Sequence, residues 1–398
     1  LICLFSIFEL GKITLNKSVG LWAAIIFTFS PLIISQRTDY LIDLSLTAFI
    51  TLTFLFITRW FLSQNIFSIY SIITGLTLGF VFLVKPTGIV LLIFPLLITF
   101  SRRIHKSKNK LLIIGELILL FSTFLIIIYP WFSKNWLTIL SSIINAWQWG
   151  IKYQEGFEIS DIESWFFYFL RIPNIIGKTS FWTLITIFLY RVFYFNSEPI
   201  FNLRASKKTN LLYLSFFLNV YLITSFMSTK EIRFFLPILP IICIFLSIIL
   251  NSKNKFKELF FKRVILITIL ITIIFYQNSF LSFFSFGKNT NIRPEDYLLH
   301  KEIIDEISKS NMNITSTLAV LPDTREINTF NLEAEASKEG EYVAVRQIIS
   351  KKDTYKFDLE NFDWFLIKTG DQGIMKNEAK ELIEKKLYDK EAFKIQKE

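Results

Sequence analysis

The residues of this sequence that could do chemistry are charged side chains at the ends of long apolar stretches. Asp43 lies at the start of one such stretch, Lys85 stands in a Pro/Gly turn between two others, and Lys230 and Arg233 precede a fourth. A carboxylate can act as a general base. Lysine can hold a phosphate oxygen as a point charge, and arginine offers a planar fork that matches phosphate oxygens. This set of residue types therefore suits chemistry on an anionic headgroup.

Each of these residues also has a purely structural explanation. Asp43 could pair with Arg37 or gain from the dipole of a helix that begins there. Lys85 could extend its ammonium to the surface without a function, and Lys230 could form a surface pair with Glu231 that contributes little. An acid inside an apolar segment is costly unless it faces water or a partner, which makes Asp43 a functional candidate by default.

Composition places the chain among membrane proteins. Hydrophobic residues make up 52% of its 398 residues, 44 of them are Phe, and the mean hydropathy is +0.47, values that exclude an ordinary soluble domain. Residues 1–287 carry 25 Lys and Arg against 11 Asp and Glu, whereas residues 288–398 carry 18 against 22. The basic excess thus belongs to loops beside the bilayer, and we expect no nucleic acid as a partner.

Ten apolar segments approach the ~20 residues that a membrane-spanning helix needs. They cover residues 1–10, 18–36, 40–60, 67–84, 86–101, 111–130, 177–196, 211–228, 234–250 and 263–283. The first is short, so the sequence predicts about nine full spans and one partial span. The chain starts at Leu1 without an initiator Met or a cleavable leader, and we expect it to be a fragment.

Lysine and arginine gather in every second connection between these spans, which predicts the orientation. Positive charge accumulates on the cytoplasmic side, so the loop 102–110 is predicted inside. The other loops on that side are residues 10–17, 60–66, 197–210 and 251–262. All four candidate residues then face outward on a multi-pass protein of the plasma (inner) membrane. We also expect Pro130 to end a span, and the Trp-rich connection 131–176 to lie partly flat on the outer membrane face.

The last part of the chain reads as a separate α/β unit. Apolar residues recur at helical spacing over 298–307 and again over 376–387, and short β-prone runs cover 317–321, 342–345 and 364–367. We therefore predict a transmembrane domain over residues 1–287 and a small extracytoplasmic α/β domain over residues 288–398.

Several common sites are missing from the sequence. Neither Cys3 nor Cys243, and neither His105 nor His300, has neighbours at the spacing of a metal site. Phosphate-binding, dinucleotide-binding, serine-hydrolase and zinc-protease motifs are also absent. We expect no metal and no cofactor, and a nucleotide-driven pump or a hydrolase is disfavoured.

An ordered set of short motifs resembles the GT-C superfamily of integral-membrane glycosyltransferases. The motifs are "SPLIISQRTDYLIDLSLTAF", "GLTLGFVFLVKPTG", "YPWFSKN" and "STKEIRFFLPILP". The sequence is most similar to bacterial family 39 enzymes, which are similar to protein O-mannosyltransferases and to the aminoarabinose transferase of lipid A. The resemblance covers residues 1 to about 283 and implies a GT-C-like helical bundle.

The resemblance also implies an activity and roles for particular residues. The donor is expected to be a sugar on a polyprenyl phosphate, used at the outer membrane face, with a lipid, glycan or protein as acceptor. Asp43 matches an acid of the active site, and Lys85, Lys230 and Arg233 match positions near the donor phosphate, with Arg37 grouped among them. The family's principal acidic residue is expected upstream of Leu1, so this chain alone could be inactive.

Two other functions fit parts of the pattern. A transporter or flippase of lipid-linked sugars would also place charges near headgroups, but transporters bind near the midplane between related halves. Here the charges gather at one face, which favours an enzyme. A polysaccharide polymerase or ligase shares the lipid donor and is disfavoured only mildly.

Overall fold

The computed structural model of the protein is mostly helical, with one small sheet. It describes residues 1–38, 42–64, 67–107, 109–153, 160–194, 203–227, 230–252, 254–275, 294–310, 315–324, 327–348, 355–368 and 377–388. The chain forms two compact units, residues 1–143 with 162–288 and residues 144–161 with 289–398. The expected domain boundary at residue 287 lies outside the described residues and stays a prediction.

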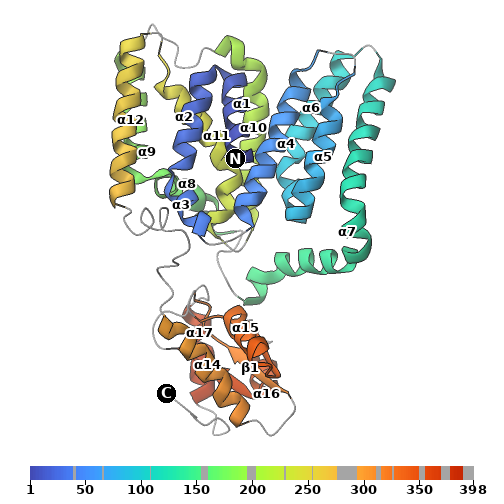
Figure 1. Ribbon diagram of the computed structural model, residues 1–398, viewed down its shortest axis with the longest axis vertical. Helices are drawn as coiled ribbons and strands as arrows, with labels where there is room; N and C mark the ends of the chain where they lie inside the picture. The colour runs from blue at the N-terminus through green and yellow to red at the C-terminus, as the bar shows by residue number, and fades with distance from the viewer. Residues whose placement is uncertain are drawn as a thin grey trace. The chain divides into compact units, whose positions relative to one another are not determined.

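The described part of the first unit is helical and includes two helices of the tighter 3-10 type (Figure 1). In chain order the helices are α1 (Ile2–Thr14), α2 (Lys17–Thr28), α3 (Pro31–Thr38), α4 (Asp43–Leu62), α5 (Tyr70–Val84), the 3-10 helix η1 (Pro86–Leu92), α6 (Ile93–Lys106), α7 (Lys110–Tyr153), α8 (Ile162–Ile176), α9 (Lys178–Tyr194), α10 (Leu203–Phe226), the 3-10 helix η2 (Ile232–Ile238), α11 (Leu239–Leu250) and α12 (Lys255–Phe275). Helix α7 continues beyond residue 143 into the second unit. A helix lies in each of the ten predicted apolar segments, which confirms the polytopic helical fold.

Among the described residues, five helical segments are long and apolar enough to cross a membrane, or seven if two bent pairs each form one span. The prediction of nine full spans and one partial span exceeds this number. The difference arises because α1 and α5 have only 13 and 15 residues, short of the ~20 that a span needs, and because α12 begins with charged residues. The bent pairs are α2 with α3, at 59°, and α8 with α9, at 100°.

Glycines allow several of these helices to approach closely. A Cβ atom at Gly79 of α5 would lie 2.7 Å from Ile127 of α7, and one at Gly75 would overlap the Leu120 carbonyl group and the Thr123 hydroxyl. The Gly-x-x-x-Gly pair is therefore a helix contact, as its spacing predicts. The same device joins α1 to α2, where a Cβ atom at Gly11 would lie 2.5 Å from the Gly20 Cα atom.

Helix α7 shows where the sequence prediction was wrong. We expected Pro130 to end a span, but α7 continues through Pro130 to Tyr153. A proline removes one helical hydrogen bond and crowds the preceding turn, which can bend a helix without ending it. The expected loop 131–176 therefore contains the second part of α7 and the whole of α8.

The second unit contains a three-stranded parallel sheet with helices on both faces. Its strands are β1 (Ser316–Val320), β2 (Val343–Gln347) and β3 (Trp364–Leu366), in the order β2-β1-β3. Their positions confirm the three predicted β-prone runs. The helices are α14 (Pro294–Lys309), α15 (Thr329–Glu339), α16 (Tyr355–Asn361) and α17 (Asn377–Tyr388), and the sequence analysis found only α14 and α17.

Alternation along the central strand builds two apolar layers. Leu318 and Val320 pack with residues of α14 and α15, whereas Ala319 and Leu321 pack with residues of α16 and α17. Successive side chains of a strand point to opposite faces, and parallel strands need crossover helices that cover both faces. The β1–α15–β2–α16–β3 order therefore accounts for a buried parallel sheet in so short a segment.

Candidate functional site

Three of the predicted site residues meet at one end of the first unit. Helix α4 begins at Asp43, and α5 runs back along it and ends at Val84, so Lys85 lies beside the start of α4. The segment that begins η2 also packs against α4 and adds Arg233. Helix ends that are far apart in the sequence are thus brought together by antiparallel packing.

The Asp43 carboxylate lies between the two cations. The Lys85 Nζ atom is 3.2 Å from Asp43 Oδ1, and the Arg233 Nε atom is 3.8 Å from Asp43 Oδ2. Arg233 also pairs with Glu231, to whose Oε1 its guanidinium donates at 2.8 Å. We call Asp43, Lys85, Glu231 and Arg233 the Asp43 cluster.

The Asp43 cluster is anchored inside but open on one side. The Asp43 side chain is only 7% exposed, whereas those of Lys85, Arg233 and Glu231 are 32%, 29% and 26% exposed. The ring of Phe234 lies against both cations, 5.2 Å from Lys85 Nζ and 5.5 Å from the Arg233 guanidinium carbon. Both cations are therefore held in place by an acid and an aromatic face, yet an incoming anion can reach them.

Lys230 contacts a helix end, and its expected position near the donor phosphate stays a prediction. Its ammonium donates to the main-chain carbonyl oxygens of Thr224 at 3.0 Å and Ser225 at 2.6 Å. These are orphan carbonyls in the last turn of α10, where the helix dipole favours a cation. Burial lowers the pKa of Lys230 to about 8 from the ordinary 10.5. In the resting structure Lys230 thus fixes the end of α10.

Arg37 also binds a helix end. Its guanidinium donates at 3.2 Å to the carbonyl oxygen of Thr28, the last residue of α2. The expected contact of Arg37 with a phosphate stays a prediction. Asp39, its neighbour in the sequence motif, lies outside the described residues.

A cavity of about 510 Å³ lies at the same end of the unit. Its wall is formed by α3, by the junction of α8 and α9 around Gly177, by Thr272 of α12 and by Ile232, the residue between Glu231 and Arg233. Gly177 has a φ of +102°, and a Cβ atom there would lie 2.8 Å from Thr272. Only glycine takes this conformation without strain, so Gly177 permits both the sharp bend and the cavity.

No group of three or more His, Cys, Asp or Glu side chains that could hold a metal ion occurs in the part of the chain that the structure describes. In the Asp43 cluster each carboxylate already faces a cation. The arrangement is suited to binding an anion through Lys85 and Arg233, with Asp43 available as a base.

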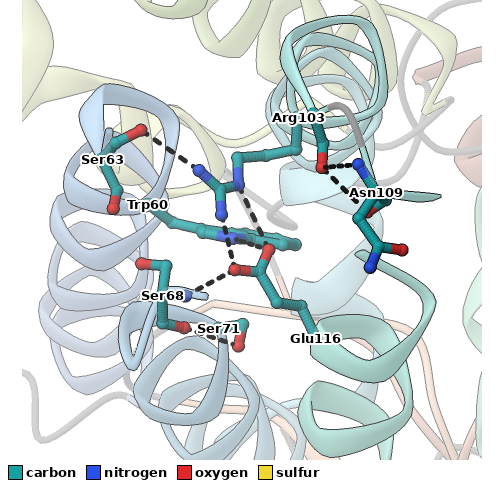
Figure 2. Close-up of polar contacts among 8 residues, drawn as sticks. Trp60, Ser63, Ser68, Ser71, Arg103, Asn109 and Glu116 are labelled. Atoms are coloured by element: carbon teal, nitrogen blue, oxygen red, sulfur yellow. Dashed lines mark hydrogen bonds and ion pairs between the residues drawn. The ribbon is translucent and has the colours of Figure 1, made fainter. Parts of the chain in front are cut away.

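A second polar cluster occupies the opposite end of α4. Figure 2 shows the Glu116 carboxylate, which is fully buried, accepting from Trp60 Nε1 at 2.9 Å, from the Ser68 amide at 2.5 Å and from the Arg103 guanidinium at 2.6 and 3.2 Å. Arg103 in turn donates to the Ser63 carbonyl oxygen at 3.1 Å. These partners come from separate turns of the chain, and no local motif in the sequence indicated them.

Other polar contacts join segments that the charge pattern assigns to one membrane side. Arg59 pairs with Glu9 at 2.8 Å. Asn16 bonds to Asn251 at 3.2 Å, and Lys262 donates to Ser18 at 2.7 Å. Asn16 and Asn251 thus join two of the connections predicted inside, and the other two contacts lie at the ends of spans beside such connections.

Helices long enough to span a membrane, with an acid and two cations gathered at one end, define a polytopic membrane protein with a charged cluster at one end of its helical unit. The sequence profile of the Alg9-like mannosyltransferase family matches residues 1–323. The chain belongs to this family and is a glycosyltransferase. The predicted class of integral-membrane glycosyltransferase is thereby confirmed.

No curated protein matches the chain. Among solved structures, the crystal structure of ArnT from Cupriavidus metallidurans bound to undecaprenyl phosphate is similar with a TM-score of 0.47 and 11% sequence identity, over 91% of this chain and 79% of that one.

Proposed function

We propose that this glycosyltransferase takes its sugar from a polyprenyl phosphate at the outer face of the plasma membrane, and that the Asp43 cluster is the reaction site. The observation that carries the proposal is the convergence of Lys85 and Arg233, from separate helical segments, on one buried carboxylate. Both cations remain partly exposed, so a phosphate group can reach them. The acceptor is a lipid, a glycan or a protein.

The cations supply the electrostatic part of the mechanism. When the bond between the sugar and the phosphate breaks, negative charge develops on the departing phosphate. Lys85 and Arg233 neutralise that charge, and because they are already fixed by Asp43, Glu231 and Phe234, little reorganisation is needed during the reaction. Arginine adds a planar pair of donors that fits two phosphate oxygens.

Asp43 supplies the acid–base part of the mechanism. As an ionised carboxylate it can take the proton from an acceptor hydroxyl or amine that attacks the sugar. The cavity beside Ile232 is available for an apolar portion of a lipid substrate, and its volume lies in the usual range of ligand pockets.

The proposal is tested by removing each cation. In a complete, active protein, Lys85→Ala and Arg233→Ala should each lower kcat/KM with a polyprenyl-phosphate sugar by about a hundredfold, the loss expected for one stabilising donor. Membrane insertion should stay unchanged, as measured by the amount of protein in carbonate-washed membranes.

Lys255→Ala is the matched control. Lys255 is an exposed cation at the start of α12 and belongs neither to the Asp43 cluster nor to the lining of the cavity beside Ile232. Its removal should leave kcat/KM within about twofold, as expected of a surface substitution away from the site. Unchanged transfer in both Lys85→Ala and Arg233→Ala would remove these cations from the mechanism.

A further inference from the structure

Helix α10 contacts both segments that bring cations to the Asp43 cluster. It packs against η1, which follows Lys85 directly, and against η2, which contains Arg233. On the η2 side the link is Lys230, whose ammonium binds the last carbonyls of α10. On the η1 side the link is a single buried polar residue, Asn219.

Asn219 lies inside α10 and is 1% exposed. Its Nδ2 atom donates at 2.8 Å to the carbonyl oxygen of Val90 in η1. A carboxamide in a membrane-spanning helix is costly unless it bonds to a neighbouring helix, and such bonds join helices. This hydrogen bond therefore holds η1 against α10.

The η1 segment is short and depends on its neighbours. A 3-10 helix has poorer hydrogen-bond geometry than an α-helix. The Gly88 amide donates at 2.8 Å to the Lys85 carbonyl oxygen, which connects the start of η1 to Lys85 itself. A Cβ atom at Gly88 would lie 2.6 Å from Leu46 of α4. Contact with α4 on one side and the Asn219 bond on the other thus hold η1 in place.

We propose that Asn219 is a positioning residue for Lys85. By fixing η1 it fixes the backbone from which the Lys85 side chain reaches Asp43. Asn219 itself touches neither Asp43 nor Lys85 among the contacts that the structure records, and it acts through η1. The consequence for phosphate binding rests on the function proposed above, whereas the hold on Lys85 does not.

The first test measures Lys85 directly. Asn219→Leu keeps the approximate size of the side chain and removes the donor, and Asn219→Ala replaces it if leucine prevents folding. The full chain in lipid nanodiscs is treated with an amine-acylating reagent, and the labelling rate of each lysine is measured by mass spectrometry. Labelling of Lys85 should rise about threefold, the factor that corresponds to an average interhelical hydrogen bond in a membrane protein, while that of Lys178 stays constant.

Ser215→Ala is the matched control. Ser215 is a buried residue of the same helix whose hydroxyl bonds at 2.7 Å only within that helix, to the Leu212 carbonyl oxygen. Its loss should leave the labelling of Lys85 as in the wild type. Equal labelling of Lys85 in Asn219→Leu, Ser215→Ala and the wild type would overturn the inference.

The second test is a double-mutant cycle with undecaprenyl phosphate as the probe. Asn219→Leu should weaken its binding about threefold in the wild-type background and should have no further effect when Lys85 is already alanine, because residues that act through one another are not additive. Additive effects would overturn the inference. A wild-type chain that does not bind the probe would contradict the proposed function instead, and the labelling of Lys85 would still decide the role of Asn219.

Discussion

At the scale of single residues, the site is made of charges whose partners are set before any ligand arrives. Asp43 and Glu231 hold Lys85 and Arg233 in the resting state, whereas Lys230 and Arg37 bind helix ends. The family resemblance implies that all four cations lie near the donor phosphate, and for each of them this stays a prediction. Residue type and position alone cannot separate a ligand-binding cation from one that caps a helix, because orphan carbonyls and phosphate oxygens attract the same groups.

Lys230 gives a pH dependence that can be measured. Its folded pKa is about 8, below the ordinary 10.5, because burial disfavours the ammonium. Between these two values the unfolded chain keeps the proton that the folded chain has released, so the contribution of Lys230 to stability rises with pH across this window and is lost as the pH falls through 8.

The measurement compares the wild type with Lys230→Met in detergent. The melting temperature of the wild type should rise relative to that of the variant as the pH goes from 8 to 10.5, on top of a constant offset for the lost hydrogen bonds. A difference that does not vary over this range would show that Lys230 is not desolvated as the structure indicates.

At the scale of elements, periodicity and spacing were sufficient to predict most helices and strands, but not the bends and connections between them. The three strands could be read from runs of β-prone residues, and the Gly75 and Gly79 pair predicted a close helix contact. The continuation of α7 through Pro130 could not be predicted, because the flanking turns decide whether a proline bends a helix or ends it. The α8–α9 bend depends on Gly177, whose positive φ is a property of the packed structure.

The buried Glu116 cluster joins the ends of α4 and α6 to the start of α7 and predicts a large loss of stability when it is broken. Glu116→Gln keeps the shape of the side chain but removes the negative charge that pairs with the buried Arg103 guanidinium. Removing one partner of a buried ion pair costs about 3–5 kcal/mol. We expect a loss of this size in the free energy of unfolding, measured by denaturant titration in mixed micelles.

Glu163→Gln provides the comparison for this variant. Glu163 is an exposed carboxylate in the first turn of α8, and its neutralisation should change the free energy of unfolding by less than about 0.5 kcal/mol. Equal stabilities of the two variants would mean that the contacts of Glu116 shown in Figure 2 do not stabilise the fold.

At the scale of the whole molecule, the distribution of charge was the most informative feature of the sequence. It predicted which connections share a membrane side, and the contact of Asn16 with Asn251 joins two connections that it assigned to the same side. It could not predict which of those connections touch, because that depends on how helices far apart in the sequence pack. The assignment of one end to the cytoplasm rests on the positive charge alone.

That assignment can be tested with single cysteines in intact cells. Cys3 and Cys243 are both buried, so they should not react with a membrane-impermeant maleimide. Cysteine is introduced at three exposed positions: Lys12 at the end of α1, Lys178 at the start of α9 and Phe330 in α15. Lys12→Cys lies among the loops with excess positive charge, which the orientation rule places inside. We expect Lys178→Cys and Phe330→Cys to react before permeabilisation and Lys12→Cys only afterwards.

The opposite result would contradict the assigned orientation. Labelling of Lys12→Cys in intact cells, with protection of Lys178→Cys, would show that the protein crosses the membrane in the reverse direction. It would also place the Asp43 cluster on the cytoplasmic face, because Lys178 and Ile232 line one cavity, and the proposed use of an outer-face donor would then be excluded.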